Sequence, residues 1–369
     1  MKIAINCRCF SKKQYTGIGR YAYHLIHSLS EIDQANQYSL YVPRRPFDFK
    51  RRDPVVKARN FHLEVDHFNR GLNRTLHPVD VYHTPCIGDV AIDNAKVVVT
   101  IHDLIYKAYP QGHTPATIDL TDQLVKAIIQ KADRIICSSQ NTINDLNRFF
   151  RVDPAKVRLV YLGVDQNIFY PVPAEEIPQA REVIRSKGIV LPYIFFVGTI
   201  EPRKNLINLL KALAILREQK KFDGPLVISG MKGWLNEDLA GVIERLDLKK
   251  RVVFLGFLTD TELRYFYSQA EVFAFPSLYE GFGLPIVEAF SCGTPVVTSN
   301  VSSCAELAHE AALAVDPTSP QAIADAIAKI IASPQLRKEL IQKGLERAKI
   351  FSFRKTAQET LKIYQEFSQ

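Results

Sequence analysis

The sequence has no apolar run long enough to cross a membrane. A membrane-spanning helix needs roughly 18 consecutive apolar residues, and no stretch of the 369 residues approaches that length. The segment from Met1 to Cys7 is too short, and too polar after Ile5, to be a secretory signal. Together these absences predict a cytoplasmic protein whose contact with a membrane, if it has one, is peripheral and on the inner face.

Cysteine is scarce and scattered. The six cysteines are Cys7, Cys9, Cys86, Cys137, Cys292 and Cys304. The Cys-x-Cys pair at the N-terminal end has no second pair at the spacing that a metal site requires. Most of the cysteines lie within apolar runs, so reduced structural thiols are expected, and no metal site is expected.

Low-complexity tracts and tandem repeats of twenty to fifty residues are also absent. The chain is 47% hydrophobic and 23% charged, as in an ordinary globular protein. Since a single core rarely grows beyond roughly 250–300 residues, a chain of 369 residues is predicted to form two domains.

Basic residues outnumber acidic ones. The net charge is +8 and the pI is about 9.0, a balance that favours anionic partners. The densest basic stretch runs from Arg44 to Arg74. It is interpreted either as a solvated loop or as a surface that docks on anionic lipid head groups. It lacks the interleaved aromatic residues of a single-strand binder, so no nucleic acid is expected as a partner.

Short β-rich apolar runs alternate with helical patterns almost throughout, which is typical of parallel sheets in α/β domains. Strands are predicted at Lys2–Asn6, Tyr38–Val42, Val79–His83, Lys96–Thr100, Arg134–Ser138, Val157–Tyr161, Tyr193–Val197, Pro225–Ser229, Val252–Leu255, Glu271–Phe275, Thr294–Thr298 and Ala312–Val315. Helices are predicted at Tyr21–Ile32, Leu120–Ala132, Leu206–Leu216, Pro320–Ile331 and Arg354–Phe367. In the second of these helices, Leu120, Leu124, Ile128 and Ile129 match one helix face.

A linker is predicted at Phe169–Pro178, because three prolines interrupt any regular element there. The sequence therefore predicts two doubly wound α/β domains, at residues 1–172 and 173–352. The last helix, within residues 353–369, is expected to pack back on the first domain.

Ligands of open parallel sheets bind at the carboxyl ends of strands, where loops lead into helices. One such place follows the predicted strand Tyr193–Val197. Arg203 and Lys204 stand there before a helix with Asn205 as its predicted N-cap. Two cations at a helix N-terminus suit a phosphate group, although paired surface charges are an equally simple interpretation.

A second such place follows Glu271–Phe275. Its loop contains Glu280 and Gly283, and a helix is predicted to begin at Leu284 with Pro285 in its first turn. Glu288 lies about one turn inside, and helical side chains tilt toward the N-terminus. Glycines leave backbone amides open to a phosphate, so the sequence predicts a ligand site here.

These residues resemble the retaining glycosyltransferases of family four. Glu280 and Glu288, which bracket Gly-Phe-Gly-Leu-Pro, look like the E-x7-E signature, and Glu201–Leu206 resembles the diphosphate-binding segment. Thr16-Gly-Ile-Gly-Arg-Tyr is similar to the N-terminal glycine loop, and Thr100-Ile-His-Asp-Leu to the histidine segment. With Ser302–Glu306, the pattern is closest to the mannosyltransferase branch, and it extends over nearly the whole chain.

The resemblance implies a GT-B fold, with two Rossmann-like domains facing a cleft, and a role for each matching residue. Arg203 and Lys204 would hold the donor diphosphate, and Glu288 would bind the ribose. Glu280 and His102 would contact the transferred sugar. The backbone of Phe282, Gly283 and Leu284 would also contact the sugar, Gly17 and Gly19 would admit the phosphates, and the backbone at Phe257 and Leu258 would hold the base.

The implied reaction is a retaining, metal-independent transfer of a hexose from a nucleotide-diphosphate sugar to a glycan or lipid-linked acceptor, in polysaccharide or glycolipid biosynthesis. GDP-mannose is the expected donor, with UDP-sugars as the alternative, and no cofactor is expected. Two positions depart from the family pattern, Leu162 before Gly-Val-Asp and Cys304-Ala305. Neither touches the predicted diphosphate site.

Three other enzyme classes share a motif or the expected fold with this sequence. Gly17-Ile-Gly-Arg-Tyr-Ala fits a dinucleotide-binding motif, but the preceding strand ends too early, at Asn6, for the tight turn that an NAD(P) oxidoreductase uses. A nucleotide-sugar epimerase or a glycan phosphorylase shares the expected fold. An epimerase would alter the donor in the absence of an acceptor.

Overall fold

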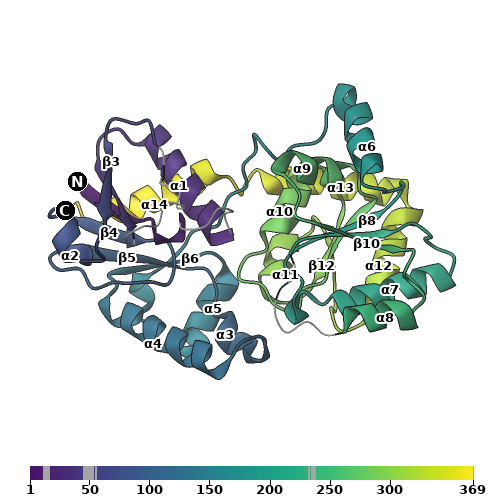
Figure 1. The fold of residues 1–369 in the computed structure, drawn as a ribbon, viewed down its shortest axis with the longest axis horizontal. Coiled ribbons are helices and arrows are strands. Elements are labelled where there is room, and N and C mark those ends of the chain that lie inside the picture. The colour runs from purple at the N-terminus through teal and green to yellow at the C-terminus, as the bar shows by residue number, and fades with distance from the viewer. Residues whose placement is uncertain (11–16, 45–53, 55, 232, 234–237, 369) are drawn as a thin grey trace. The chain divides into compact units, whose positions relative to one another are not determined.

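The computed structural model describes residues 1–10, 17–44, 54, 56–231, 233 and 238–368. The chain forms two compact units (Figure 1). Unit 1 comprises Met1–Gly163 and Ser352–Gln369, and unit 2 comprises Val164–Phe351. The sequence placed the boundary further along, after residue 172.

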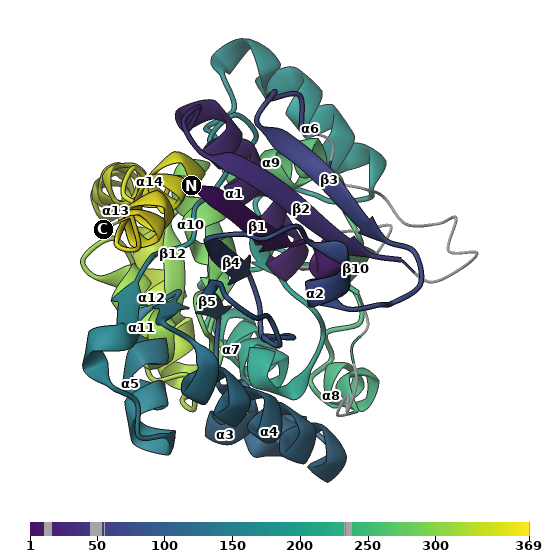
Figure 2. The same ribbon diagram turned by 90° about the vertical axis from the view of Figure 1, so that its left-hand side faces the viewer.

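Unit 1 contains a parallel sheet in the order β3-β2-β1-β4-β5-β6-β7. Figure 2, which faces this unit, shows β3, β2, β1, β4 and β5 side by side. The strands are β1 (Lys2–Asn6), β2 (Gln37–Pro43), β3 (Phe61–Asp66), β4 (Val81–Thr84), β5 (Lys96–Ile101), β6 (Arg134–Cys137) and β7 (Val157–Leu159). The helices are α1 (Gly17–Ile32), α2 (Leu72–Thr75), α3 (Ile105–Ala108), α4 (Pro115–Lys131), α5 (Gln140–Phe149) and α14 (Phe353–Gln365), with 3-10 turns at Arg8–Phe10, Pro110–Gly112 and Pro154–Lys156.

Helix α14 is the last helix of the chain and belongs to unit 1. It packs beside α1 (Figure 1). The buried hydroxyl of Tyr364 lies 2.6 Å from Nδ1 of His83 on β4. Glu366 pairs with Arg134 at 2.6 Å and with Arg158 at 2.9 Å. The last residues of the sequence therefore complete the core of the unit that contains the first.

Unit 2 contains a second parallel sheet, in the order β10-β9-β8-β11-β12-β13. Its strands are β8 (Ile194–Val197), β9 (Leu226–Ser229), β10 (Val252–Gly256), β11 (Val272–Phe275), β12 (Val296–Ser299) and β13 (Leu313–Val315). Its helices are α6 (Ile177–Ser186), α7 (Leu206–Glu218), α8 (Leu239–Arg245), α9 (Asp260–Gln269), α10 (Leu284–Ser291), α11 (Ser302–Ala308), α12 (Pro320–Ala332) and α13 (Pro334–Ala348), with 3-10 turns at Ala174–Glu176 and Pro202–Lys204. The predicted pair of Rossmann-like parallel-sheet domains is confirmed.

The two crossings of the chain between the units lie at neighbouring residues. In unit 1, Gly163 lies so close to Ser352 and Phe353 that a methyl group on it would overlap their backbone atoms. In unit 2, the amide of Val164 donates to the carbonyl of Phe351 at 3.0 Å. Only glycine fits at position 163 without a backbone shift.

Three local predictions are wrong. Pro178 does not interrupt structure, because it occupies the first turn of α6, where its missing N–H has no cost. Strand β3 was not predicted, although Phe61, Leu63 and Val65 alternate with polar residues there; it is an edge strand whose Leu63 is 42% exposed. Of the predicted face of α4, Leu120 and Leu124 are exposed, at 60% and 37%, while Ile128 is buried as expected together with Val125.

No helix in the described parts of the chain combines the length and the apolar character needed to span a membrane.

Candidate functional site

Two loops of unit 2 meet at the carboxyl edge of its sheet. They follow β8 and β11, which are paired as parallel neighbours. The amide of Leu278 donates to the carbonyl of Arg203 at 2.7 Å, and the hydroxyl of Ser277 donates to the same oxygen at 3.0 Å. The structure therefore brings together the two segments that the sequence singled out.

A cluster of charges joins the two loops. Glu280 pairs through one carboxylate oxygen with Lys204 at 2.5 Å and through the other with Arg203 at 2.8 Å. The guanidinium of Arg203 also pairs with Glu201 at 2.6 Å, and Ser277 donates to Glu280 at 2.6 Å. Glu201 and Ser277 were not predicted as site residues. The sequence showed their positions after strand ends but not their partners.

The cluster keeps Glu280 ionised. Burial alone would raise the pKa of this carboxyl group, but the charges of Arg203 and Lys204, with hydrogen bonds from Lys204 and Ser277, outweigh burial and lower the pKa to about 2. Burial lowers the pKa of Lys204, and the carboxylate of Glu280 opposes that shift. Lys204 is only 7% exposed, so its charge acts in a poorly screened environment.

Residues Glu280–Gly283, called the glycine loop below, lead into α10. This helix begins at Leu284, as predicted. Gly283 is the N-cap, with φ 108°, a conformation that side chains other than glycine rarely adopt. Pro285 lies in the first turn, and no side chain caps the helix. Backbone N–H groups at an uncapped helix N-terminus suit an anion. Phe282 and Gly283 are buried, and Leu284 is half-buried.

Two serines of α11 hold this loop in place. The hydroxyl of Ser303 donates to the carbonyls of Glu280 and Phe282, at 2.9 and 2.7 Å. The amide of Glu280 donates to the hydroxyl of Ser302 at 3.1 Å. The sequence marked both serines only as part of the Ser302–Glu306 stretch and assigned them no contact.

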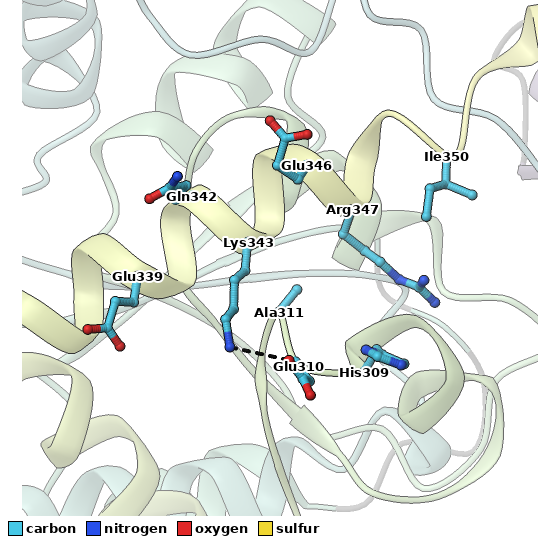
Figure 3. Close-up of a pocket in the computed structure, with 9 residues that line it drawn as sticks. All are labelled: His309, Glu310, Ala311, Glu339, Gln342, Lys343, Glu346, Arg347 and Ile350. Carbon is cyan, nitrogen blue, oxygen red and sulfur yellow. Dashed lines mark hydrogen bonds and ion pairs between the residues drawn. The ribbon is translucent and has the colours of Figure 1, made fainter.

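Helix α11 is also fixed at its other end. The guanidinium of Arg347 on α13 donates to the carbonyls of Glu306 at 2.8 Å and Leu307 at 3.3 Å. Figure 3 shows Arg347 beside His309 in a surface pocket of about 520 Å³ between α13 and the turn after α11. None of the predicted site residues lines this pocket.

Glu288 lies within α10 and is 8% exposed. Its carboxylate accepts a hydrogen bond of 2.9 Å from the hydroxyl of Tyr267 on α9. Leu258 follows β10 at the same carboxyl edge of the sheet; its side chain is buried, and that of the preceding Phe257 is 58% exposed.

The predicted N-cap role of Asn205 needs correction. Asn205 stands at the N-cap position of α7, but its side chain makes no capping hydrogen bond. Instead its amide donates to the carbonyls of Pro276 at 2.8 Å and Pro317 at 2.7 Å. The side chain of Asn205 therefore binds the loops after β11 and β13 rather than its own helix.

His102 belongs to unit 1 and follows β5. Its Nε2 lies 2.9 Å from the carbonyl of Pro85. A carbonyl only accepts, so Nε2 carries the proton and Nδ1 of the neutral ring is an acceptor. That Nδ1 is buried and has no partner among the described residues. Burial lowers the pKa of His102, against opposing effects of Pro85 and Asp103, which favours the neutral ring.

The prediction that Gly17 and Gly19 lie in a loop is wrong. Helix α1 begins at Gly17 and includes both glycines. A Cβ on Gly17 would meet no atom within 4 Å. Thr16 and the residues before it back to Ser11 lie outside the described part of the chain.

The fold brings Cys86 to the Cys-x-Cys pair, which the sequence did not predict. Cys9 and Cys86 share a side-chain hydrogen bond that lowers the pKa of Cys86, with the charge of Arg8 acting in the same direction and burial opposing them. All six cysteines are free thiols. Among the described residues, no three His, Cys, Asp or Glu side chains are grouped so that they would hold a metal ion.

The basic stretch is described only in part. Lys57, Arg59, Arg70 and Arg74 are exposed, and Phe68 between them is 73% exposed. Arg45 and Lys50–Arg52 lie outside the described residues.

Two family models match the chain. "Glycosyltransferase Family 4" matches residues 15–168, and "Glycosyl transferases group 1" matches residues 182–347. The O-antigen chain mannosyltransferase B of Escherichia coli is 29% identical over 96% of this chain and 97% of its own length. The MMP alpha-(1->4)-mannosyltransferase of Mycolicibacterium hassiacum is 29% identical over 66% of this chain and 56% of its own length.

Solved structures share the fold at low sequence identity. Sucrose-phosphate synthase from Thermosynechococcus elongatus has a TM-score of 0.77 and 22% identity, over 99% of this chain and 98% of that chain. WaaG, a glycosyltransferase involved in lipopolysaccharide biosynthesis, has a TM-score of 0.74 and 17% identity, over 98% and 99%. The structure of Anabaena Alr3699/HepE in complex with UDP-glucose has a TM-score of 0.73 and 18% identity, over 99% and 100%.

The two family models match segments of both units, and the relatives that are similar to this chain include mannosyltransferases. The chain therefore belongs to the family 4 glycosyltransferases with the GT-B fold, in the mannosyltransferase branch, and it is a hexosyltransferase.

Proposed function

We propose that this chain transfers mannose from GDP-mannose to a glycan or lipid-linked acceptor, with retention of configuration and without a metal ion. The observation that carries the proposal is the meeting of Arg203, Lys204 and the glycine loop at one edge of the sheet. The choice of mannose rests on the similarity to the two mannosyltransferases.

The cations and the helix N-terminus suit a diphosphate leaving group. Negative charge develops on the diphosphate as its bond to the sugar breaks, and fixed positive groups stabilise that charge most effectively. Arg203 offers a planar fork to two oxygens, and Lys204 a point charge. We propose that they supply the electrostatic stabilisation for which other enzymes use a divalent cation.

Glu280 is proposed to position groups rather than to form a covalent intermediate. Its two carboxylate oxygens already bind Lys204, Arg203 and Ser277. A carboxylate engaged by two cations is a weak nucleophile. In a retaining transfer the departing phosphate can take the proton of the acceptor hydroxyl, so no separate base is required. A glycosyl–Glu280 adduct in a mass spectrum would contradict this role.

Further roles are assigned by residue chemistry. Glu288 is proposed to accept hydrogen bonds from the ribose hydroxyls, and the backbone at Leu258 to bind the base. His102, with Nδ1 as an acceptor, is proposed to bind a hydroxyl of the transferred sugar.

The exposed basic residues around Phe68 are proposed to make peripheral contact with an anionic membrane on the cytoplasmic side, which suits a lipid-linked acceptor.

The donor is tested by thermal unfolding with GDP-, UDP- and ADP-sugars. GDP-mannose is expected to raise the unfolding temperature most, because at equal concentrations the ligand with the lowest Kd stabilises the folded state most. A larger shift with a UDP-sugar would favour the alternative donor, which the UDP-glucose complex of a similar fold makes the second candidate.

The site is tested by the double substitution Arg203→Ala with Lys204→Ala. A loss of at least about 100-fold in kcat/KM is expected, since single groups that stabilise developing charge are worth that much. The charge-matched control is Lys249→Ala with Lys250→Ala, two exposed residues of the same unit. Arg203→Lys keeps the charge and removes the fork. Retained turnover in the double variant would refute the assignment.

A further inference from the structure

Tyr267 contacts the proposed ribose-binding carboxylate from a different helix. Its hydroxyl donates to Oε2 of Glu288 at 2.9 Å. Tyr267 lies on α9 and is fully buried, and Glu288 lies on α10 and is 8% exposed. The phenol therefore reaches the carboxylate from within the core of unit 2.

The phenol is held in a fixed orientation by other aromatic rings. Phe195 and Phe273 pack edge-on against Tyr267, with ring centroids 5.2 and 5.1 Å away. Phe169 packs in the same manner at 6.1 Å. Edge-to-face contacts at these distances are favourable and directional. The hydroxyl is consequently a rigid donor.

We propose that Tyr267 is a positioning residue that sets the orientation of the Glu288 carboxylate for the ribose hydroxyls of the donor. This inference rests on the ribose role proposed above for Glu288.

The physical reason is the freedom of a glutamate side chain. The last torsion of glutamate is broad, so the carboxylate plane is not fixed by the side chain itself. Two hydrogen bonds from one ribose require a defined plane. A hydrogen bond to a carboxylate is stronger than one between neutral groups, so the phenol fixes the plane before the nucleotide binds and lowers the entropy cost of binding.

The test compares GDP with 2′,3′-dideoxy-GDP, and UDP with its dideoxy form, by isothermal titration calorimetry. Tyr267→Phe keeps the ring and removes only the hydroxyl. We expect it to weaken binding of the ribonucleotide by about 10-fold, the value of one charge-assisted hydrogen bond, and to leave binding of the dideoxynucleotide unchanged. In turnover, KM for the donor is expected to rise while kcat stays the same.

Two reference variants separate the possible outcomes. Glu288→Gln is expected to remove most of the preference for ribose. Tyr193→Phe removes a buried hydroxyl of the same unit that donates to the carbonyl of Phe266 at 2.7 Å, and it is expected to keep the preference of the parent. The preference for ribose is the ratio of the Kd of the dideoxynucleotide to the Kd of the ribonucleotide. Both values are measured on one preparation of each variant, so a loss of active protein does not change the ratio.

If Tyr267→Phe kept the parental preference while Glu288→Gln lost it, the positioning role would be refuted and the proposed function would stand. If Tyr267→Phe weakened both nucleotides equally, Tyr267 would be structural only, which also refutes the role. If neither variant changed the preference, the ribose role of Glu288 would fail, and this inference with it.

Discussion

At the residue scale, Glu280 is the link between the two loops of the site. A buried carboxylate is costly unless it is paired, and here Lys204, Arg203 and Ser277 all contact it. The same contacts fix the positions of both cations. The stability of this part of unit 2 is therefore tied to the ionisation of one carboxyl group.

Because the ion pairs require an ionised Glu280, the free energy of unfolding is predicted to depend on pH. The pKa of Glu280 is lowered from 4.5 to about 2, so the ion pairs stabilise the folded state fully above pH 4.5, and the contribution is lost as the pH falls toward 2. The loss is about 3 kcal/mol over that window. Glu280→Gln has no such group, so its free energy of unfolding is expected to be lower than that of the parent at pH 7, with a difference that narrows in acid.

Urea unfolding at pH 7, 5, 4 and 3 measures this difference. Glu271→Gln is the control, since Glu271 pairs with Arg337 in a more exposed position of the same unit. A difference between parent and Glu280→Gln that stayed constant from pH 7 to pH 3 would disprove the linkage.

At the element scale, α11 is a short helix held at both ends. Ser303 at its first turn binds the glycine loop, and Arg347 binds the carbonyls of its last turn. The helix is thus a brace for the loop that carries Glu280 and Gly283. A change in its serines should act on donor binding through the loop.

Ser303→Ala tests this brace. It removes the hydroxyl that donates to the carbonyls of Glu280 and Phe282, and the loss of a hydrogen bond to a buried group costs about 1–3 kcal/mol. Donor affinity is expected to fall by about 10-fold, measured by calorimetry, with a lower unfolding temperature. Ser291→Ala makes the same chemical change in α10, at a buried hydroxyl with no partner among the described residues, and should change neither quantity. Equal effects of the two substitutions would argue against the brace.

Local sequence patterns predicted most of the helices and strands, and two examples show why such a pattern succeeds or fails. The start of α10 at Leu284 was predicted because glycines precede it and Pro285 suits a first helical turn, and the structure has Gly283 as the N-cap. Leu120 was wrongly placed on the buried face of α4 because a helical period does not say which of two apolar faces meets the sheet.

The partners of buried polar groups could not be predicted. Tyr267 and Glu288, or Ser303 and Phe282, are separated by 21 residues in each case, and no local period links them. Sequence reasoning predicted Arg203, Lys204, Glu280 and Glu288 as site residues from the loops and helix starts that follow two strands. The contacts that orient them depend on how α9, α10 and α11 pack around the sheet.

At the scale of the whole molecule, unit 1 depends on a helix from the far end of the sequence. Helix α14 buries Phe353, Ile363 and Tyr364, and burying each large apolar side chain contributes about 1.5–3 kcal/mol. Their sum is comparable with the total stability of a domain, about 5–15 kcal/mol. Unit 2 contains no residue of α14.

A chain that ends at Phe351 is therefore expected to lose unit 1 and keep unit 2. Limited proteolysis with mass spectrometry would then show rapid cleavage within residues 1–163 and a resistant fragment within 164–351. A chain that ends at Gln365 keeps α14 and serves as the control. Resistance of residues 1–163 in the shorter chain would contradict the dependence.

The crossings at Gly163 and Phe351 make unit 2 an insertion within unit 1. A ribosome synthesises all of the inserted unit before it synthesises α14. Unit 2 is thus the first unit whose residues have all been synthesised. The surface of unit 1 that contacts α14, at α1 and His83, stays uncovered until α14 has been made. The order of synthesis and the order of completion are reversed in this protein.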